Sequence, residues 1–199
     1  FVKNRSNSSV SSTDQSWVVY HSFMAHGAAM FLNTNDSKIN HSPFWNSTAP
    51  TSTTFSVGTD SRTNTSADNY IAYCFAEKQG YSKFGSYTGN NNADGPFIYT
   101  GFKPAWLMIK ATGTTGGASA WRIADNKRSS SGGSNPVEKQ LEADTANTED
   151  SGNDVDLLSN GFKVRSTAAQ WNASGVSIIY MAFAEHPFVS SKGVPVTAR

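Results

Sequence analysis

Short apolar runs separated by polar stretches make up the hydrophobic pattern of the chain. In 161–165 two apolar residues alternate with Lys163 and Arg165, and this period of two predicts a strand with one buried face. The run 176–185 is apolar on both faces, so we expect a central strand between two layers. A turn leads into a second core strand within 101–110.

The composition favours the same fold class. Leu, a favoured residue of helix interiors, occurs only five times, whereas Phe, which packs well on a pleated sheet, occurs twelve times. A short helix would fit within 137–146, but its sequence signal is weak. The stretch 89–95 is rich in Asn, Asp and Gly, which tolerate positive φ, and is expected to hold a tight turn. We predict an all-β fold, an antiparallel β-sandwich or jelly roll.

An internal repeat is the strongest signal in the sequence. Residues 64–77 align without gaps on 172–185, a shift of 108 residues. Identities fall at Asn64, Ser66, Ile71, Phe75, Ala76 and Glu77. Three further matches keep the same order along the chain: 1–3 with 108–110, 16–19 with 120–123, and 55–59 with 162–166. Collinear matches at nearly constant spacing indicate two related units.

The repeat predicts how the chain is organised. Residues 1–80 form a first unit that lacks its opening strands, and 81–199 form a second, nearly complete unit with a C-terminal tail. Packing of both halves into one sandwich is the alternative.

Charge and cysteine use exclude some classes of protein. The net charge is +1 with 16% charged residues, which disfavours a nucleic-acid binder with a basic face. The sequence has no apolar run of about 18 residues, so we expect no membrane insertion. Cys74 is the only cysteine and lies in an apolar run, where a buried, unreactive thiol is expected.

Motifs for catalysis, cofactors or metals are not evident in the sequence. The four histidines form no metal-ligand pair, and neither a nucleophile elbow nor a nucleotide-binding loop occurs. Glu77 and Glu185 recur at equivalent repeat positions, which favours a structural role over the paired acids of a glycosidase. We therefore expect no catalytic residues, no cofactor and no metal.

An acidic segment at 144–156 offers oxygen ligands of the type that calcium prefers. It lacks the regular ligand spacing of an EF-hand loop, so a solvated loop is the favoured interpretation and calcium binding the alternative.

Aromatic residues in the polar loops suggest a ligand site. Trp45, Tyr87 and Trp171 could offer ring faces to a sugar, while Asn91 and Asp94 bond its hydroxyl groups. The competing interpretation is that these rings fold back and close the end of the sandwich.

Longer stretches carry a family resemblance. Residues 44–58, 70–89 and 95–110 resemble repeat domains in tail and fibre proteins of tailed bacteriophages, especially phages of aquatic bacteria, and 156–165 and 179–188 continue the similarity. The resemblance implies a virion appendage, hence an extracellular location. It brings no catalytic residues with it.

Together these features predict a non-enzymatic module of a phage tail or fibre, used for structural display and recognition of the host surface. Its expected partners are other virion proteins, further copies of itself in a homo-oligomer, and a host surface glycan or protein. A purely structural assembly or decoration protein is one alternative, and a polysaccharide-depolymerising glycoside hydrolase is another.

Overall fold

The computed structural model describes residues 1–6, 15–113, 120–128 and 135–187, which form an all-β protein as predicted. The chain divides into two compact units, Phe1–Phe75 and Ala76–Arg199. The division therefore falls a few residues before the boundary expected from the repeat. Residues 188–199 of the expected C-terminal tail lie outside the described ranges. None of the helices described is long and apolar enough to cross a membrane.

The first unit is built on one antiparallel sheet. Its strands, in spatial order, are β4 (Ile39–Asn40), β3 (Ala28–Phe31), β2 (Val18–Val19), β1 (Val2–Asn4) and β5 (Tyr70–Ala72). The 3-10 helix η2 (Ser42–Phe44) leads to Phe44 and Trp45, which pack with Val2, Val18 and Phe31 of the sheet. This cluster is the core of the unit.

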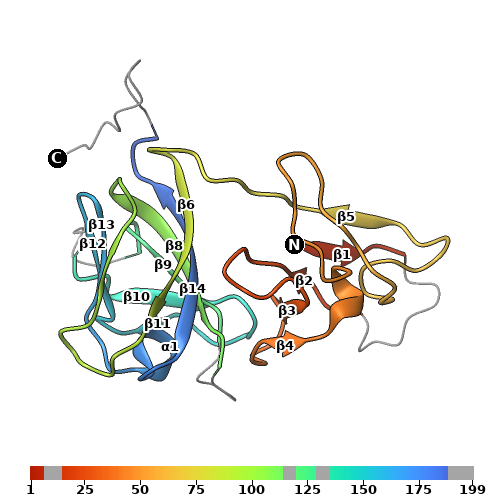
Figure 1. The fold of residues 1–199 in the computed structure, drawn as a ribbon. Helices are drawn as coiled ribbons and strands as arrows, with labels where there is room; N and C mark the ends of the chain where they lie inside the picture. The colour runs from red at the N-terminus through yellow and green to blue at the C-terminus, as the bar shows by residue number, and fades with distance from the viewer. Residues whose placement is uncertain (7–14, 114–119, 129–134, 188–199) are drawn as a thin grey trace. The chain divides into compact units, whose positions relative to one another are not determined.

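The second unit is a sandwich of two antiparallel sheets (Figure 1). The larger sheet contains, in order, β11 (Asp150–Ser151), β10 (Lys139–Glu142), β9 (Arg122–Asp125), β8 (Pro104–Ala111), β14 (Ser177–Ala184) and β6 (Ser82–Thr88). The smaller sheet contains β12 (Val155–Leu158), β13 (Gly161–Val164) and β7 (Phe97–Tyr99). The helix α1 (Ala169–Asn172) follows β13 along the chain.

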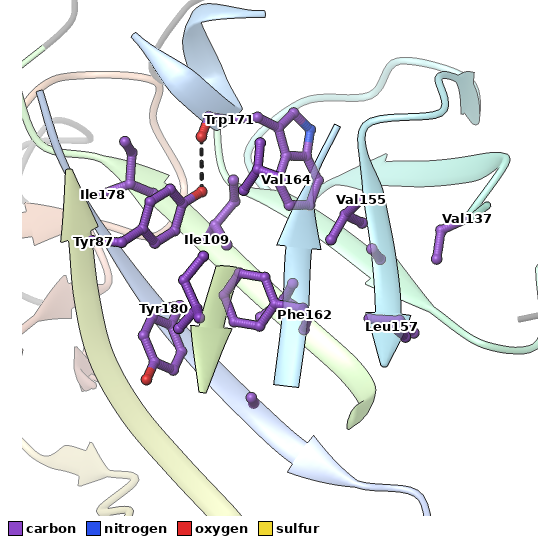
Figure 2. Close-up of a cluster of buried hydrophobic side chains, with 14 of the residues drawn as sticks. Tyr87, Ile109, Val137, Val155, Leu157, Phe162, Val164, Trp171, Ile178 and Tyr180 are labelled. Carbon is purple, nitrogen blue, oxygen red and sulfur yellow. Dashed lines mark hydrogen bonds between the residues drawn. The ribbon is translucent and has the colours of Figure 1, made fainter. Parts of the chain in front are cut away.

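Side chains from both sheets form the core of the second unit. Figure 2 shows Phe162 and Val164 of β13 among Ile109, Ile178 and Tyr180 of the larger sheet. All five are buried, and burial of each large apolar side chain contributes about 2 kcal/mol. The alternation predicted for 161–165 is confirmed, because Phe162 and Val164 are buried and Arg165 is exposed. In β14 the consecutive residues 178–182 are all buried, as the apolar character of both faces predicted, and the strand lies between β8 and β6 in its sheet.

The short helix that the sequence allows within 137–146 does not form, because this segment contains the strand β10. Gln140 of β10 pairs with Ala124 on one side and with Asp150 on the other. Two neighbouring strands satisfy its backbone, and these nonlocal hydrogen bonds outweigh the weak local preference for helix.

The two units share strand order and register. The order β4-β3-β2-β1-β5 corresponds to β11-β10-β9-β8-β14. Val2 pairs with Ala72 in the first sheet, and their repeat equivalents Ile109 and Tyr180 pair in the second. The other strand pairs of the first sheet, β1–β2, β2–β3 and β3–β4, match the pairs β8–β9, β9–β10 and β10–β11 of the second in the same way. The sequence repeat is thus matched by a repeat in backbone pairing.

Cys74 is exposed, which corrects the expectation of a buried thiol. Its repeat equivalent, Ala182 of β14, is completely buried. The difference arises because β14 is covered by β6 on its outer edge, whereas β5 is the last strand of its sheet. An apolar run predicts a core strand, but the covering partner depends on tertiary structure.

Candidate functional site

Three of the five residues expected to bind a ligand are buried. Trp45, Tyr87 and Trp171 expose between 1% and 9% of their surface. No ring face is open to a sugar, so the structure corrects their expected role as stacking platforms. Trp45 belongs to the first unit, whereas Tyr87 and Trp171 meet in the second.

Polar atoms on these rings explain why they can be buried. The Tyr87 hydroxyl donates to the Trp171 carbonyl oxygen at 2.8 Å (Figure 2), and the Trp171 indole donates to Gln140 Oε1 at 2.9 Å. The Trp45 indole donates to the Ala28 carbonyl oxygen at 3.1 Å. Each ring is therefore buried while its own O–H or N–H donor keeps a hydrogen-bond partner.

The loop at 89–95 is held in place by Asn172, which is completely buried. Asn172 Nδ2 donates to Asn90 Oδ1 at 3.0 Å and to the Asn92 carbonyl oxygen at 2.8 Å. The backbone of Asn172 adds a bond, because its carbonyl oxygen accepts from the Asn91 amide at 2.9 Å. The loop is therefore a fixed part of the sandwich.

Asn91 and Asp94 remain exposed on this loop. Asn91 has a φ of 53°, so the positive φ expected in this stretch occurs there. The Asp94 amide donates to Asn92 Oδ1 at 2.9 Å, which sets the backbone at this end of the loop. Both side chains are thus exposed to solvent, and hydrogen bonds fix the backbone that carries them.

Asp94 forms an ion pair with Lys163 of β13, at 2.8 Å between Oδ1 and Nζ. Lys163 Nζ also donates to the Gly95 carbonyl oxygen at 2.8 Å. The hydrogen bond and the positive charge of Lys163 lower the pKa of Asp94, and Arg165 adds to this effect. At neutral pH the loop therefore presents a carboxylate beside an ammonium group.

Phe97 and Tyr99 of β7 lie beside this ion pair and are 46% and 65% exposed. Phe97 pairs with Lys163 across the smaller sheet, and Tyr99 pairs with Gly161 two residues along. The intervening Ile98 points into the core. Phe97, Ile98 and Tyr99 are three consecutive apolar residues, so the sequence carries no polar alternation that marks two of them as outward-facing. Only the pairing of β7 with β13 reveals the two exposed rings.

We call Asp94, Phe97, Tyr99 and Lys163 the β7 patch. Its cross-strand pairs and its ion pair place two exposed rings, a carboxylate and an ammonium group on the outer face of the smaller sheet. Such a combination can stack on the apolar face of a sugar ring and bond its hydroxyl groups. Asn91, on the same loop, adds an exposed amide.

Glu77 and Glu185 are each tied to neighbouring groups. Glu77 forms an ion pair with Lys83 at 2.9 Å and accepts a hydrogen bond from a backbone amide at 3.3 Å. Glu185 pairs with Lys103 at 2.9 Å and accepts from Asn126 Nδ2 at 2.8 Å. The hydrogen bond from Lys103 lowers the pKa of Glu185. These contacts are those of residues that anchor strand ends.

Arginine side chains pair with acids in and next to the 144–156 segment. Arg122 pairs with Glu142 and Asp150, at 2.9 and 2.8 Å, and Arg128 pairs with Glu149 at 3.2 Å. Within the described ranges, no cluster of three or more His, Cys, Asp or Glu residues is arranged to hold a metal ion.

The fold and the site define this chain as a two-unit all-β protein that carries an exposed polar and aromatic patch on its second unit. The chain belongs to the family DUF7483, a domain of unknown function, whose model matches residues 2–187. The match spans both units. Neither the curated proteins nor the solved structures contained a match to the chain.

Proposed function

We propose that this protein is a non-enzymatic module of a bacteriophage tail or fibre, and that it recognises a glycan on the host surface through the β7 patch. The phage assignment is supported by the resemblance of 44–58, 70–89 and 95–110 to repeat domains of tail and fibre proteins. The glycan assignment is supported by the chemistry of the patch.

The observation that carries recognition is the exposure of Phe97 and Tyr99 next to the Asp94–Lys163 pair. Exposed aromatic rings flanked by polar groups are typical of binding surfaces, since rings stack while charged groups fix orientation. The two rings are carried by a strand of the sandwich, and the loop beside them is fixed by Asn172. Little conformational entropy would be lost when a ligand binds.

Binding to host cells and to purified host polysaccharide tests this proposal. The double variant Phe97→Ala, Tyr99→Ala should weaken binding about tenfold or more, which corresponds to about 1.4 kcal/mol of lost stacking. Phe23→Ala is the matched control, because Phe23 is also exposed but lies in the first unit. Unmodified protein that neither binds host cells nor blocks phage attachment would rule out recognition.

A reducing-end assay on the same polysaccharide addresses the hydrolase alternative. Turnover that is lost in Glu77→Gln or Glu185→Gln would replace the non-enzymatic proposal with a depolymerase. We expect no release of reducing ends.

A structural assembly or decoration role is the second candidate, and the edge strand β5 favours it. An edge strand presents unpaired backbone groups that can pair with another chain. Copies of the protein or other virion proteins would be its partners. Localisation of the protein in the assembled particle by cryo-electron microscopy distinguishes a tail or fibre position from a decorating one.

A further inference from the structure

One element of the second unit has no counterpart among the described residues of the first. The strand β6, the loop at 89–95 and the strand β7 precede β8, and β8 is the repeat equivalent of β1. This strand–loop–strand element, hereafter the β6–β7 element, covers the second unit at three places. At each place the residue that the element covers has a repeat equivalent in the first unit. The exposure of the two equivalent residues shows what the element covers.

The first place is the outer edge of β14. Ala182 pairs with Lys83 of β6 and is completely buried in the core. Its equivalent in the first unit, Cys74, is exposed. The backbone around Cys74 therefore lies where a strand equivalent to β6 would pair.

The second place is the conserved asparagine of the repeat. Asn172 Nδ2 donates to the Ser166 carbonyl oxygen at 2.8 Å, and Asn64 Nδ2 makes a similar bond to the Gly58 carbonyl oxygen at 2.7 Å. Asn172 is buried because it also binds the 89–95 loop, whereas Asn64 is exposed. The side chain that anchors the loop in one unit is thus open to water in the other.

The third place is the strand that faces β7. Phe162 of β13 pairs with Ile98 of β7 and is completely buried. Its equivalent in the first unit, Phe55, is 42% exposed. Exposed aromatic surface at this position is what remains when no strand covers it.

We infer that the first unit is an acceptor for a strand–loop–strand polypeptide of the β6–β7 kind. One such element would pair with the outer edge of β5, bind Asn64 through its loop and cover Phe55, as β6–β7 does in the second unit. The absence of this one element from the described residues of the first unit explains why Cys74, Asn64 and Phe55 are all exposed. The inference does not depend on the proposed host recognition.

The acceptor also differs from the second unit in a way that defines the occupant. Gly85 of β6 pairs with Tyr180, and a Cβ atom on Gly85 would lie 2.5 Å from the tyrosine hydroxyl oxygen. The equivalent of Tyr180 in the first unit is Ala72, which leaves that space open. The occupant can therefore carry a side chain where β6 requires glycine.

The test joins a second copy of the sequence of residues 76–107 directly ahead of Phe1 in the full chain, because Phe1 aligns with Met108 in the repeat. Cys74 is the only cysteine, so its reaction with a maleimide reports on the edge of β5 and no cysteine has to be introduced. We expect the reaction to slow at least tenfold, with hydrogen-exchange protection at 72–75. A fused segment of the same composition in scrambled order should leave both unchanged.

Two measurements keep the inference falsifiable. Asn64→Ala should speed Cys74 labelling in the fused chain and leave it unchanged in the unfused chain, because only the fused loop binds Asn64. If the fused chain does not fold, a free peptide of residues 76–107 is added to the unfused protein at increasing concentration, and saturable protection of Cys74 is expected. Equal Cys74 reactivity with and without the segment, in the fused chain or with the peptide, would overturn the inference.

Discussion

Asn90 and Asn172 are joined by two hydrogen bonds, one from the Asn90 amide to Asn172 Oδ1 at 2.8 Å and one from Asn172 Nδ2 to Asn90 Oδ1 at 3.0 Å. The buried side chain of Asn172 thereby adds to the backbone hydrogen bond that joins the loop to α1. Removal of a buried side chain that has several hydrogen-bond partners leaves those partners without it.

Asn172→Ala is therefore expected to lower the free energy of unfolding by about 3 kcal/mol. The Asn90 amide loses its acceptor, and the oxygen atoms of Asn90 and Asn92 lose their donor. Urea denaturation measures the change. Asn64→Ala is the matched control and should cost about 1 kcal/mol, because Asn64 is exposed and makes one bond, to Gly58. Equal losses in the two variants would contradict the anchoring role of Asn172.

Gly85→Ala should destabilise the second unit by about 2 kcal/mol, because the new Cβ atom would overlap the ring of Tyr180. The clash depends on that ring, so the same substitution should cost much less in a Tyr180→Ala background. Thermal unfolding of the two single variants and the double variant gives the coupling between the sites. Strict additivity would show that the ring is not what excludes a side chain at Gly85.

Tyr180 should make stability fall at high pH. Burial, with a smaller effect from the charge of Glu77, raises the pKa of its hydroxyl to about 12. The folded state then retains a proton that the unfolded state releases above about pH 10, so stability is complete below pH 10 and declines as the pH rises toward 12. Comparison with Tyr180→Phe isolates this loss, which we expect to reach about 2 kcal/mol. Parallel pH profiles for the two proteins would refute the assignment.

Asp60 should make the first unit sensitive to acid. Burial alone would raise the pKa of this carboxyl, but hydrogen bonds from Arg62 and His41 outweigh it and hold the pKa below its ordinary value. The carboxylate therefore contributes stability above about pH 4, and that contribution is lost as the pH falls through the lowered pKa.

Asp60→Asn tests this contribution and should cost about 2 kcal/mol at pH 7 through the lost pairing with Arg62. The difference from the unmodified protein should shrink below pH 4. Unfolding followed by circular dichroism between pH 2 and pH 7 provides the measurement, since this range runs from about two units below to about three units above an ordinary carboxyl pKa. A difference that stays constant with pH would show that the charge of Asp60 is not involved.

Local sequence pattern determined much of the fold. Alternation in 161–165 and the apolar run at 176–185 placed two strands in the core of the second unit. Spacing between matched segments predicted two related units, and in the structure their strands pair in the same register. These features follow from sequence because a strand has a fixed period of two and an equivalent sequence meets equivalent neighbours.

Only the tertiary structure decided which of these surfaces meet water. Trp171 and Tyr99 are both aromatic residues near polar loops, yet Trp171 is buried beneath the sandwich end and Tyr99 is exposed on β7. Cys74 and Ala182 occupy the same repeat position with opposite exposure. Periodicity assigns a side chain to one face of its strand, but whether another element covers that face depends on contacts between residues far apart in the chain.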